Sequence, residues 1–129
     1  MYSEKVIKHF KNPTFVGEID NPDGIGEVGN KVCGDVMVVQ IKVGKKQNNS
    51  TPIEFIKDIR FQTFGCVAAI ASSDMLCELA KGKSLEQANQ ITNKDVSESL
   101  GKLPPIKEHC SNLAADALKN AIKDFRSKN

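Results

Sequence analysis

The feature that most constrains this chain is the order of its two residue patterns, with strand-like segments first and helical periodicity after residue 66. Asp35–Val43 is rich in β-branched residues, and Ile53–Phe64 alternates apolar with polar residues. The apolar face of the second segment consists of Ile53, Phe55, Ile59 and Phe61. The polar run Gly44–Pro52 predicts a turn between them, with the Lys45–Lys46 pair in solvent.

Helices account for most of the rest. The spacing of apolar residues, capping residues, glycines and prolines predicts helices over Ser3–Phe10, Val67–Gly82, Ser84 onward, Thr92–Leu100 and the stretch after Cys110. Ser84 and Gln87 form a capping-box pattern. The glycine-rich stretch 17–34 predicts turns and one irregular strand. Together these elements predict an α+β fold, a small three-stranded antiparallel sheet with helices packed on one face.

Composition narrows the class of protein. The 129 residues suit a single domain, residues 1–129, with a core that needs no disulfides. A net charge of +2, from 18 basic and 16 acidic residues, argues against a nucleic-acid surface. No apolar run approaches the ~18 residues of a membrane span, and the N-terminus resembles neither a signal nor a transit peptide. We therefore expect a cytoplasmic protein, or a mitochondrial matrix protein if the chain is a mature eukaryotic form.

Three of the four cysteines, Cys33, Cys66 and Cys110, fall at predicted element ends. Cys66 and Cys110 are expected at helix N-termini, where unpaired N–H groups and the helix dipole favour the thiolate that ligates metal. Cys77 lies inside a helix, eleven residues from Cys66 and therefore ~16 Å away, which predicts a core residue.

The spacing of these cysteines indicates an open site. No C-x₂-C pair of the kind found in structural zinc modules occurs, so only the tertiary fold could bring the three together. Asp35 and His109 are further potential ligands beside them. Taken singly, Asp35 could equally be a surface carboxylate at a strand edge and His109 a helix-cap residue. A site made by loop tips on a prefolded body suits exchange.

The residues around the cysteines carry a family resemblance that covers essentially the whole chain. Its motifs are Cys33-Gly34-Asp35-Val36-Met37, Thr63-Phe64-Gly65-Cys66, Leu103-Pro104-Pro105-Ile106-Lys107 and His109-Cys110-Ser111. In these motifs the chain resembles the IscU family of iron–sulfur cluster assembly scaffolds, which is related to the N-terminal domain of NifU. It departs from the family pattern at Val67, where a small residue is usual, and at Asp74, where serine is frequent.

The resemblance implies a scaffold rather than an enzyme, with an IscU/SufE-like fold. It implies that Cys33, Cys66 and Cys110 hold a [2Fe–2S] cluster, with Asp35 and His109 as the other candidate ligands. A cysteine desulfurase would supply persulfide sulfur, with Cys110 as first acceptor. Iron and electrons from ferredoxin would complete the cluster, which then moves to apo-proteins.

The resemblance also implies further partners. The motif formed by Leu103, Pro104, Pro105, Ile106 and Lys107 resembles the family's recognition site for a dedicated Hsp70-type chaperone with its J-type partner. A frataxin-like protein is another expected partner, and we expect a monomer or a weak homo-oligomer. From the residues alone, an X-Pro-Pro stretch is also simply a helix-breaking, exposed loop.

Ligand chemistry leaves the fourth ligand open between Asp35 and His109. Three thiolates suit an iron–sulfur cluster, and a harder fourth ligand would make it easier to release. The same set could bind Zn²⁺ tetrahedrally, so zinc is an expected alternative occupant. Two rival hypotheses are a structural zinc protein, which would unfold on metal removal, and a sulfurtransferase or thiol oxidoreductase with Cys110 or Cys66 as nucleophile. A sulfurtransferase or thiol oxidoreductase would turn over its substrate without iron. The chain lacks the C-x-x-C motif of redox enzymes, which argues against an oxidoreductase.

Overall fold

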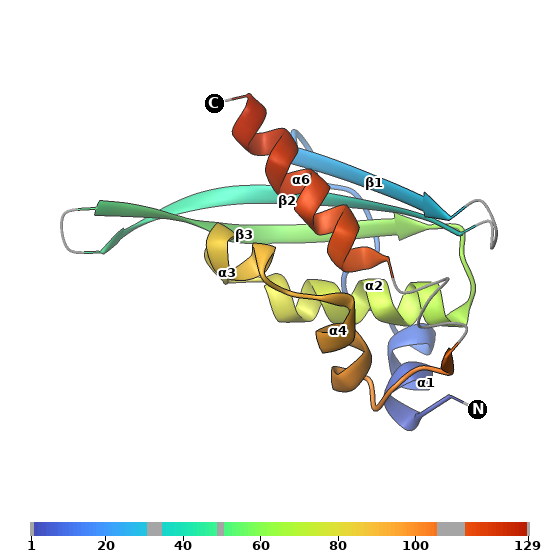
Figure 1. Cartoon of the computed structure of the whole chain (residues 1–129). Coiled ribbons are helices and arrows are strands. Elements are labelled where there is room, and N and C mark those ends of the chain that lie inside the picture. The colour runs from blue at the N-terminus through green and yellow to red at the C-terminus, as the bar shows by residue number, and fades with distance from the viewer. Residues whose placement is uncertain (1, 31–34, 49–50, 106–112, 129) are drawn as a thin grey trace.

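The structure is a computed structural model that describes residues 2–30, 35–48, 51–105 and 113–128. Its sheet has three antiparallel strands in the order β1-β2-β3, as the sequence predicts. The strands are β1 (Gly24–Asn30), β2 (Asp35–Asn48) and β3 (Thr51–Thr63). β2 and β3 are much longer than β1, so their hairpin extends beyond the rest of the sheet (Figure 1).

The described helices are α1 (Glu4–Lys11), α2 (Val67–Ala80), α3 (Leu85–Asn89), α4 (Asn93–Ser99) and α6 (Ala114–Ser127). The starts of α1, α3 and α4 follow from side-chain caps that satisfy N–H groups of the first turn, whereas α2 and α6 have no such cap. Ser3 caps α1, which shifts that helix by one residue from the predicted range. The predicted capping box of Ser84 and Gln87 is confirmed at α3, and α4 has a second one.

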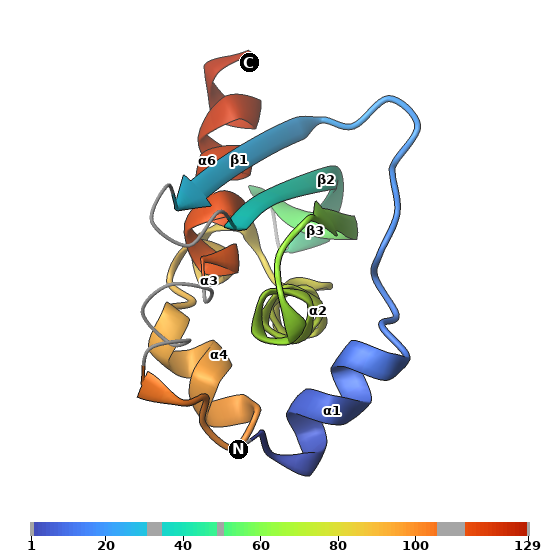
Figure 2. The same cartoon turned by 90° about the vertical axis from the view of Figure 1, so that its right-hand side faces the viewer.

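One face of the sheet carries the core. Alternate residues of β2, namely Met37, Val39 and Ile41, are fully buried beneath the helices. In Figure 2, α2 and α6 lie on the same side of the sheet, while α1 and α4 pack against α2 away from it. The intervening residues Val36 and Val38 are only half-buried on the opposite face. The predicted α+β arrangement with helices on one face is therefore confirmed.

The α6 helix lies unusually close to β1, because β1 has glycine where the two backbones meet. A Cβ on Gly26 would stand 2.0 Å from the carbonyl oxygen of Ala117, and one on Gly24 would stand 2.2 Å from that of Ala121. No side chain fits at either distance. The glycines of this strand therefore set the depth at which α6 packs on the sheet.

The long hairpin corrects two predictions. Residues 44–48 and 51–52 are strand rather than turn, and the Lys45–Lys46 pair belongs to β2. The register shifts between Lys42 and Val43, which leaves Lys57 as an extra residue in β3. Such a bulge moves the following side chains to the other face.

The bulge makes the predicted apolar face of the second segment wrong at its outer end. Ile56 is fully buried, whereas Phe55 and Ile53 are only half-buried. The ring of Phe55 instead lies against Gly44, and the ammonium of Lys46 stands 4.4 Å from the ring centroid. Only Ile59 and Phe61 of the predicted face belong to the core.

The outer edge of β1 is covered by polar side chains of α6. The carboxylate of Asp124 accepts a hydrogen bond from the N–H of Ile25 at 3.0 Å, and the amide of Asn120 donates to the carbonyl of Glu27 at 3.2 Å. Exposed backbone groups on an edge strand would otherwise be available to another chain. These two side chains therefore protect the edge of the sheet.

The contact of Asp124 predicts a pH dependence of stability. The Ile25 N–H, and next Lys128, hold the pKa of Asp124 below its ordinary value of about 3.9. Around this pH the folded chain therefore binds fewer protons than the unfolded chain. The contribution of Asp124 to the free energy of unfolding is complete above the ordinary pKa. It is lost as the pH falls through the lowered pKa. We expect Asp124→Asn to flatten the dependence of stability on pH below about pH 4.

Urea unfolding between pH 2.5 and 6 measures this effect. Asn120→Ala is the control, because it removes the other side-chain contact to the edge of β1 without removing a titratable group, and it should lower stability equally at every pH. Identical profiles for wild type and Asp124→Asn would contradict the role given to Asp124.

Candidate functional site

Cys66 lies at the junction of β3 and α2. It is the N-cap of α2, with an extended backbone (φ −82°, ψ −172°), and its carbonyl accepts the first hydrogen bond of the helix from Ile70 at 3.1 Å. Its side chain is half-buried. The first turn of α2 contains no acidic residue, so no carboxylate competes for the positive end of the helix dipole. A thiolate ligand is well placed there.

Thr63 holds the turn before Cys66 against the start of β2. Its hydroxyl donates to the carbonyl of Val36 at 2.6 Å and accepts from the N–H of Gly65 at 3.1 Å. Asp35, which precedes Val36, is the first residue of β2, and its backbone pairs with that of Asn30 in β1. The backbone of Asp35 and the Cys66 turn are thus fixed at the same end of the sheet.

Three of the five predicted ligands, Cys33, His109 and Cys110, lie outside the described residues. The described parts of the chain nearest to these residues lie on one side of the molecule (Figure 1). They are the end of β1, the start of β2, the end of β3 and the N-termini of α2 and α6. Within the described part of the chain, no three His, Cys, Asp or Glu side chains are grouped as metal ligands. Of the predicted set, the structure gives a side-chain environment for Cys66 alone.

The last helix follows Cys110, as predicted, but Cys110, which lies outside the described residues, is not its N-cap. α6 begins at Ala114, with Leu113 as its N-cap, three residues beyond Cys110. The first turn of α6 also contains Asp116, which already occupies the positive end of that dipole. The dipole argument therefore applies to Cys66 and not, through α6, to Cys110.

Cys77 is a core residue, as the sequence predicts. Its side chain is fully buried in α2, within the main hydrophobic cluster. Burial, and next the charge of Asp74, raise the pKa of the Cys77 thiol well above its ordinary value. A buried neutral thiol of this kind does not serve as an exchangeable ligand.

The Leu-Pro-Pro segment is less exposed than predicted. Leu103 is buried, and its N–H donates to the hydroxyl of Ser97 at 3.2 Å. Pro104 is half-buried, and Pro105 is exposed and already helical, which proline tolerates in a first turn. Ile106 and Lys107 lie outside the described residues. The prediction of an exposed, non-helical stretch is therefore wrong for Leu103 and Pro105.

An apolar surface around Phe64, two residues before Cys66 in the chain, was not predicted from the sequence. Phe64 is 92% exposed, and with Val16, Val36 and Val38 it borders a hollow of about 370 Å³. An exposed aromatic ring beside a candidate ligand is unusual for a single chain in water, and such surfaces mark contacts with partners. The alternating segment Ile53–Phe64 predicted Phe61 inside, but Phe64 is its last residue, and alternation does not show how far a terminal aromatic ring is exposed.

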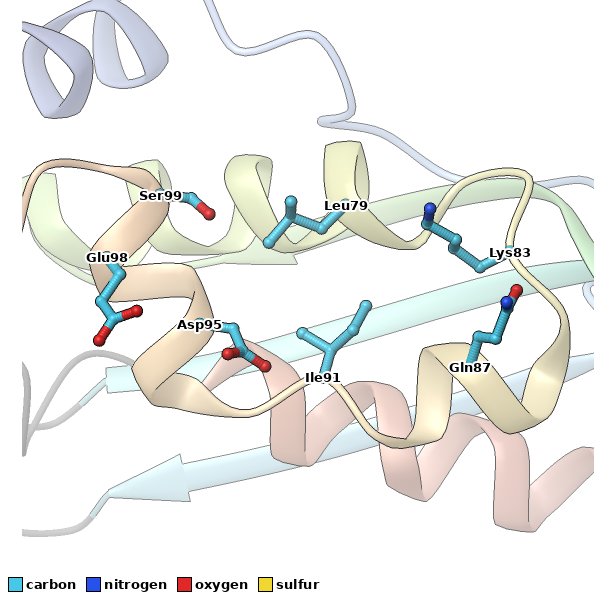
Figure 3. Close-up of a pocket in the computed structure, with 7 residues that line it drawn as sticks. All are labelled: Leu79, Lys83, Gln87, Ile91, Asp95, Glu98 and Ser99. Carbon is cyan, nitrogen blue, oxygen red and sulfur yellow. The ribbon is translucent and has the colours of Figure 1, made fainter.

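A second hollow, of about 380 Å³, lies near the other end of α2 (Figure 3). It is lined by Leu79, Lys83, Gln87, Ile91, Asp95, Glu98 and Ser99. Leu79 is thirteen residues from Cys66 along the helix, which corresponds to ~20 Å. The carboxylate of Asp95 already accepts the N–H of Thr92 in the α4 capping box, which lowers its pKa. None of the described residues that line this hollow is a cysteine or a histidine, and Cys66 is not among them.

Among the helices that the structure describes, none combines the length and apolar character needed to cross a bilayer.

Comparison with known proteins gives the family. The model of the NifU-like N terminal domain matches residues 1–129. The chain is 57% identical over 129 residues to the iron-sulfur cluster assembly scaffold protein IscU 1 of Archaeoglobus fulgidus, covering 100% of this chain and 79% of that one.

It is also 52% identical over 130 residues to the scaffold protein IscU of Escherichia coli K12, covering 98% of this chain and 95% of that one. Among solved structures, a putative iron-sulfur cluster assembly scaffold protein from Fervidobacterium islandicum has the same fold, with a TM-score of 0.70 at 24% identity over 94% of this chain and 96% of that one. The chain belongs to the family of NifU-like N-terminal domains.

Proposed function

We propose that this chain, acting as one domain over residues 1–129, is a scaffold on which a [2Fe–2S] cluster is assembled and from which it passes to apo-proteins. The ligands are the thiolates of Cys33, Cys66 and Cys110, completed by Asp35 or His109. The cluster is the cargo of the scaffold and not a resident cofactor. The chain is not an enzyme, and its curated relatives are named as scaffold proteins.

The observation that carries this proposal is the position of Cys66. Cys66 is the N-cap residue of α2, at the end of the sheet where the start of β2 is fixed through Thr63. The chain enters and leaves the two segments with the other cysteines from the same side. Soft thiolates on the rim of a prefolded body can hold an iron–sulfur cluster and still let a partner reach it. Zn²⁺ would be accepted by the same donors.

The proposal includes several partners. A cysteine desulfurase delivers sulfur as a persulfide, first to Cys110, ferredoxin supplies electrons, and apo-proteins receive the cluster. The exposed surface around Phe64 and Val36 lies at the end of β3, the strand that leads into Cys66, and suits such a partner. A frataxin-like protein and an Hsp70-type chaperone with its J-type partner are further candidates. Because Leu103 is buried, the chaperone would bind mainly the residues after it. We place the chain in the cytoplasm, or in the mitochondrial matrix if it is a mature eukaryotic form.

Anaerobic reconstitution tests the function. With ferrous iron, cysteine and a cysteine desulfurase, we expect the visible absorption of a cluster, with two iron and two sulfide ions per cluster. Without iron, mass spectrometry should find an added sulfur atom on Cys110. Absence of iron and sulfide from the purified product under all loading conditions would contradict the proposal.

The same sample separates the two rival functions. The core that we describe contains no candidate ligand except the partly buried Cys66, so metal removal with EDTA should leave the far-UV circular dichroism unchanged. A structural zinc protein would unfold instead. A sulfurtransferase would turn over a thiol acceptor without iron, and such turnover would favour the enzyme hypothesis.

A further inference from the structure

Asp74 is a buried carboxylate that the proposed cluster chemistry does not use. It lies in the middle of α2, is 1% exposed, and stands where the resembled family frequently has serine. One carboxylate oxygen accepts the N–H groups of Thr14 and Phe15, at 2.8 and 2.9 Å. The other lies 2.6 Å from Nδ1 of His9, in α1. A single side chain therefore joins α2 to both α1 and the segment that follows it.

Apolar packing alone holds α1 weakly. Val6 is its one buried residue, and Phe10 is 36% exposed. By contrast, α6 buries seven residues. Ordering each residue of a helix costs conformational entropy, and the burial of one valine side chain offsets that cost for only about one or two residues. An eight-residue helix with one buried side chain therefore depends on its polar contacts.

The N-terminal segment has two further attachments. At its start, the hydroxyl of Ser3 donates to the carbonyl of Leu100, at the end of α4. After the Asp74 contacts, the carbonyl of Phe15 accepts the N–H of Phe61, and the N–H of Gly17 donates to the carbonyl of Phe61. The segment is thus fixed at both ends and by Asp74 between them.

We propose that residues 2–15 form an N-terminal clamp that opens and closes as one unit, with Asp74 as the residue that holds it closed. Opening removes three polar contacts from one buried carboxylate at once, which couples α1 to Thr14 and Phe15. It also uncovers the side of α2 around Met75 and releases the end of α4, from which the chain runs to Leu103. The inference is independent of cluster binding.

Amide hydrogen exchange of Asp74→Ser tests this proposal. Ile7 and Asn12 are the informative amides, because they donate to carbonyls within or just before α1 and not to Asp74. We expect both to exchange at least tenfold faster than in wild type, by a factor similar to that of Thr14 and Phe15. Amides of α6 should stay within twofold. Trypsin should cut faster at Lys5, Lys8 and Lys11.

The matched control is Asp116→Ser. Asp116 accepts from the amide of Asn93 and joins α6 to α4. Because Asn at this position would keep an acceptor oxygen, the control is made as Asp116→Ser, the same change as at Asp74. It shortens a half-buried carboxylate contact elsewhere and should not change exchange in α1. Asp74→Asn keeps an acceptor oxygen for Thr14 and Phe15 and should give a smaller increase. It also provides the same comparison if Asp74→Ser does not fold.

Two results would overturn the proposal. If Thr14 and Phe15 accelerate while Ile7 and Asn12 do not, Asp74 anchors only a local turn. If α6 accelerates by the same factor as α1, Asp74 contributes to global stability and no separate clamp exists.

Discussion

Serine in place of Cys66 is expected to abolish stable loading of the chain with a cluster, while leaving its fold intact. The hydroxyl oxygen is a hard, weakly acidic donor that does not replace a thiolate on iron. Because Cys66 is half-buried at the N-cap of α2, and serine is a favourable N-cap residue, the helix should start normally. Iron and sulfide content per chain after anaerobic reconstitution measures the effect, and circular dichroism checks the fold.

Cys77→Ser is the matched control, since it makes the same chemical change on the same helix. Cys77 is fully buried in the core, so its replacement should lower stability by about 1–3 kcal/mol without preventing loading. The opposite pattern, with loading lost in Cys77→Ser and kept in Cys66→Ser, would remove Cys66 from the site.

Gly26→Ala is expected to cause the largest loss of stability among single changes in the sheet. The added Cβ would meet the backbone of α6, with the carbonyl oxygen of Ala117 at 2.0 Å and the N–H nitrogen of Ala121 at 2.4 Å. Backbone cannot move aside by a change of rotamer, so the helix must shift away from β1. We expect a loss of about 3 kcal/mol, at the upper end for overpacking, in urea unfolding.

Gly82→Ala gives the comparison for this prediction. Gly82 has a φ of +85° after α2, and a Cβ there would have no neighbour within 4 Å. Alanine at this position should lower the free energy of unfolding only by the cost of a left-handed backbone, about 1 kcal/mol. A Gly26→Ala variant as stable as Gly82→Ala would show that α6 is free to move outward.

The fold could be predicted from sequence wherever one local rule decides the structure. Alternation placed β2 and β3, and the capping box placed the start of α3. The outer hairpin could not be predicted, because Lys57 is a bulge and a single inserted residue exchanges the two faces without any change in composition. The close contact of Gly26 with α6 joins elements far apart in the sequence. In the sequence, Gly26 belongs to a glycine-rich stretch that indicated only turns and an irregular strand.

The candidate site divides in the same way. The position of Cys66 follows from the change of periodicity around it, and the core position of Cys77 follows from its place inside a helix. The start of α6 was misjudged because neither Cys110 nor Leu113 carries a side-chain cap signal. The contacts of Asp74 join residues about sixty positions apart, and no local pattern reveals them.

The bulge at Lys57 also separates the hairpin into two parts with different tolerance of change. On the inner side, Met37, Ile59 and Phe61 belong to the core. On the outer side, none of the residues 42–47 and 51–55 is buried. Because β2 rises ~3.3 Å per residue over 13 steps, its outer end lies about 40 Å from the end that holds Asp35. A fluorophore or affinity tag attached at Lys45 or Gln47 would therefore report on the molecule from a position remote from the candidate ligands.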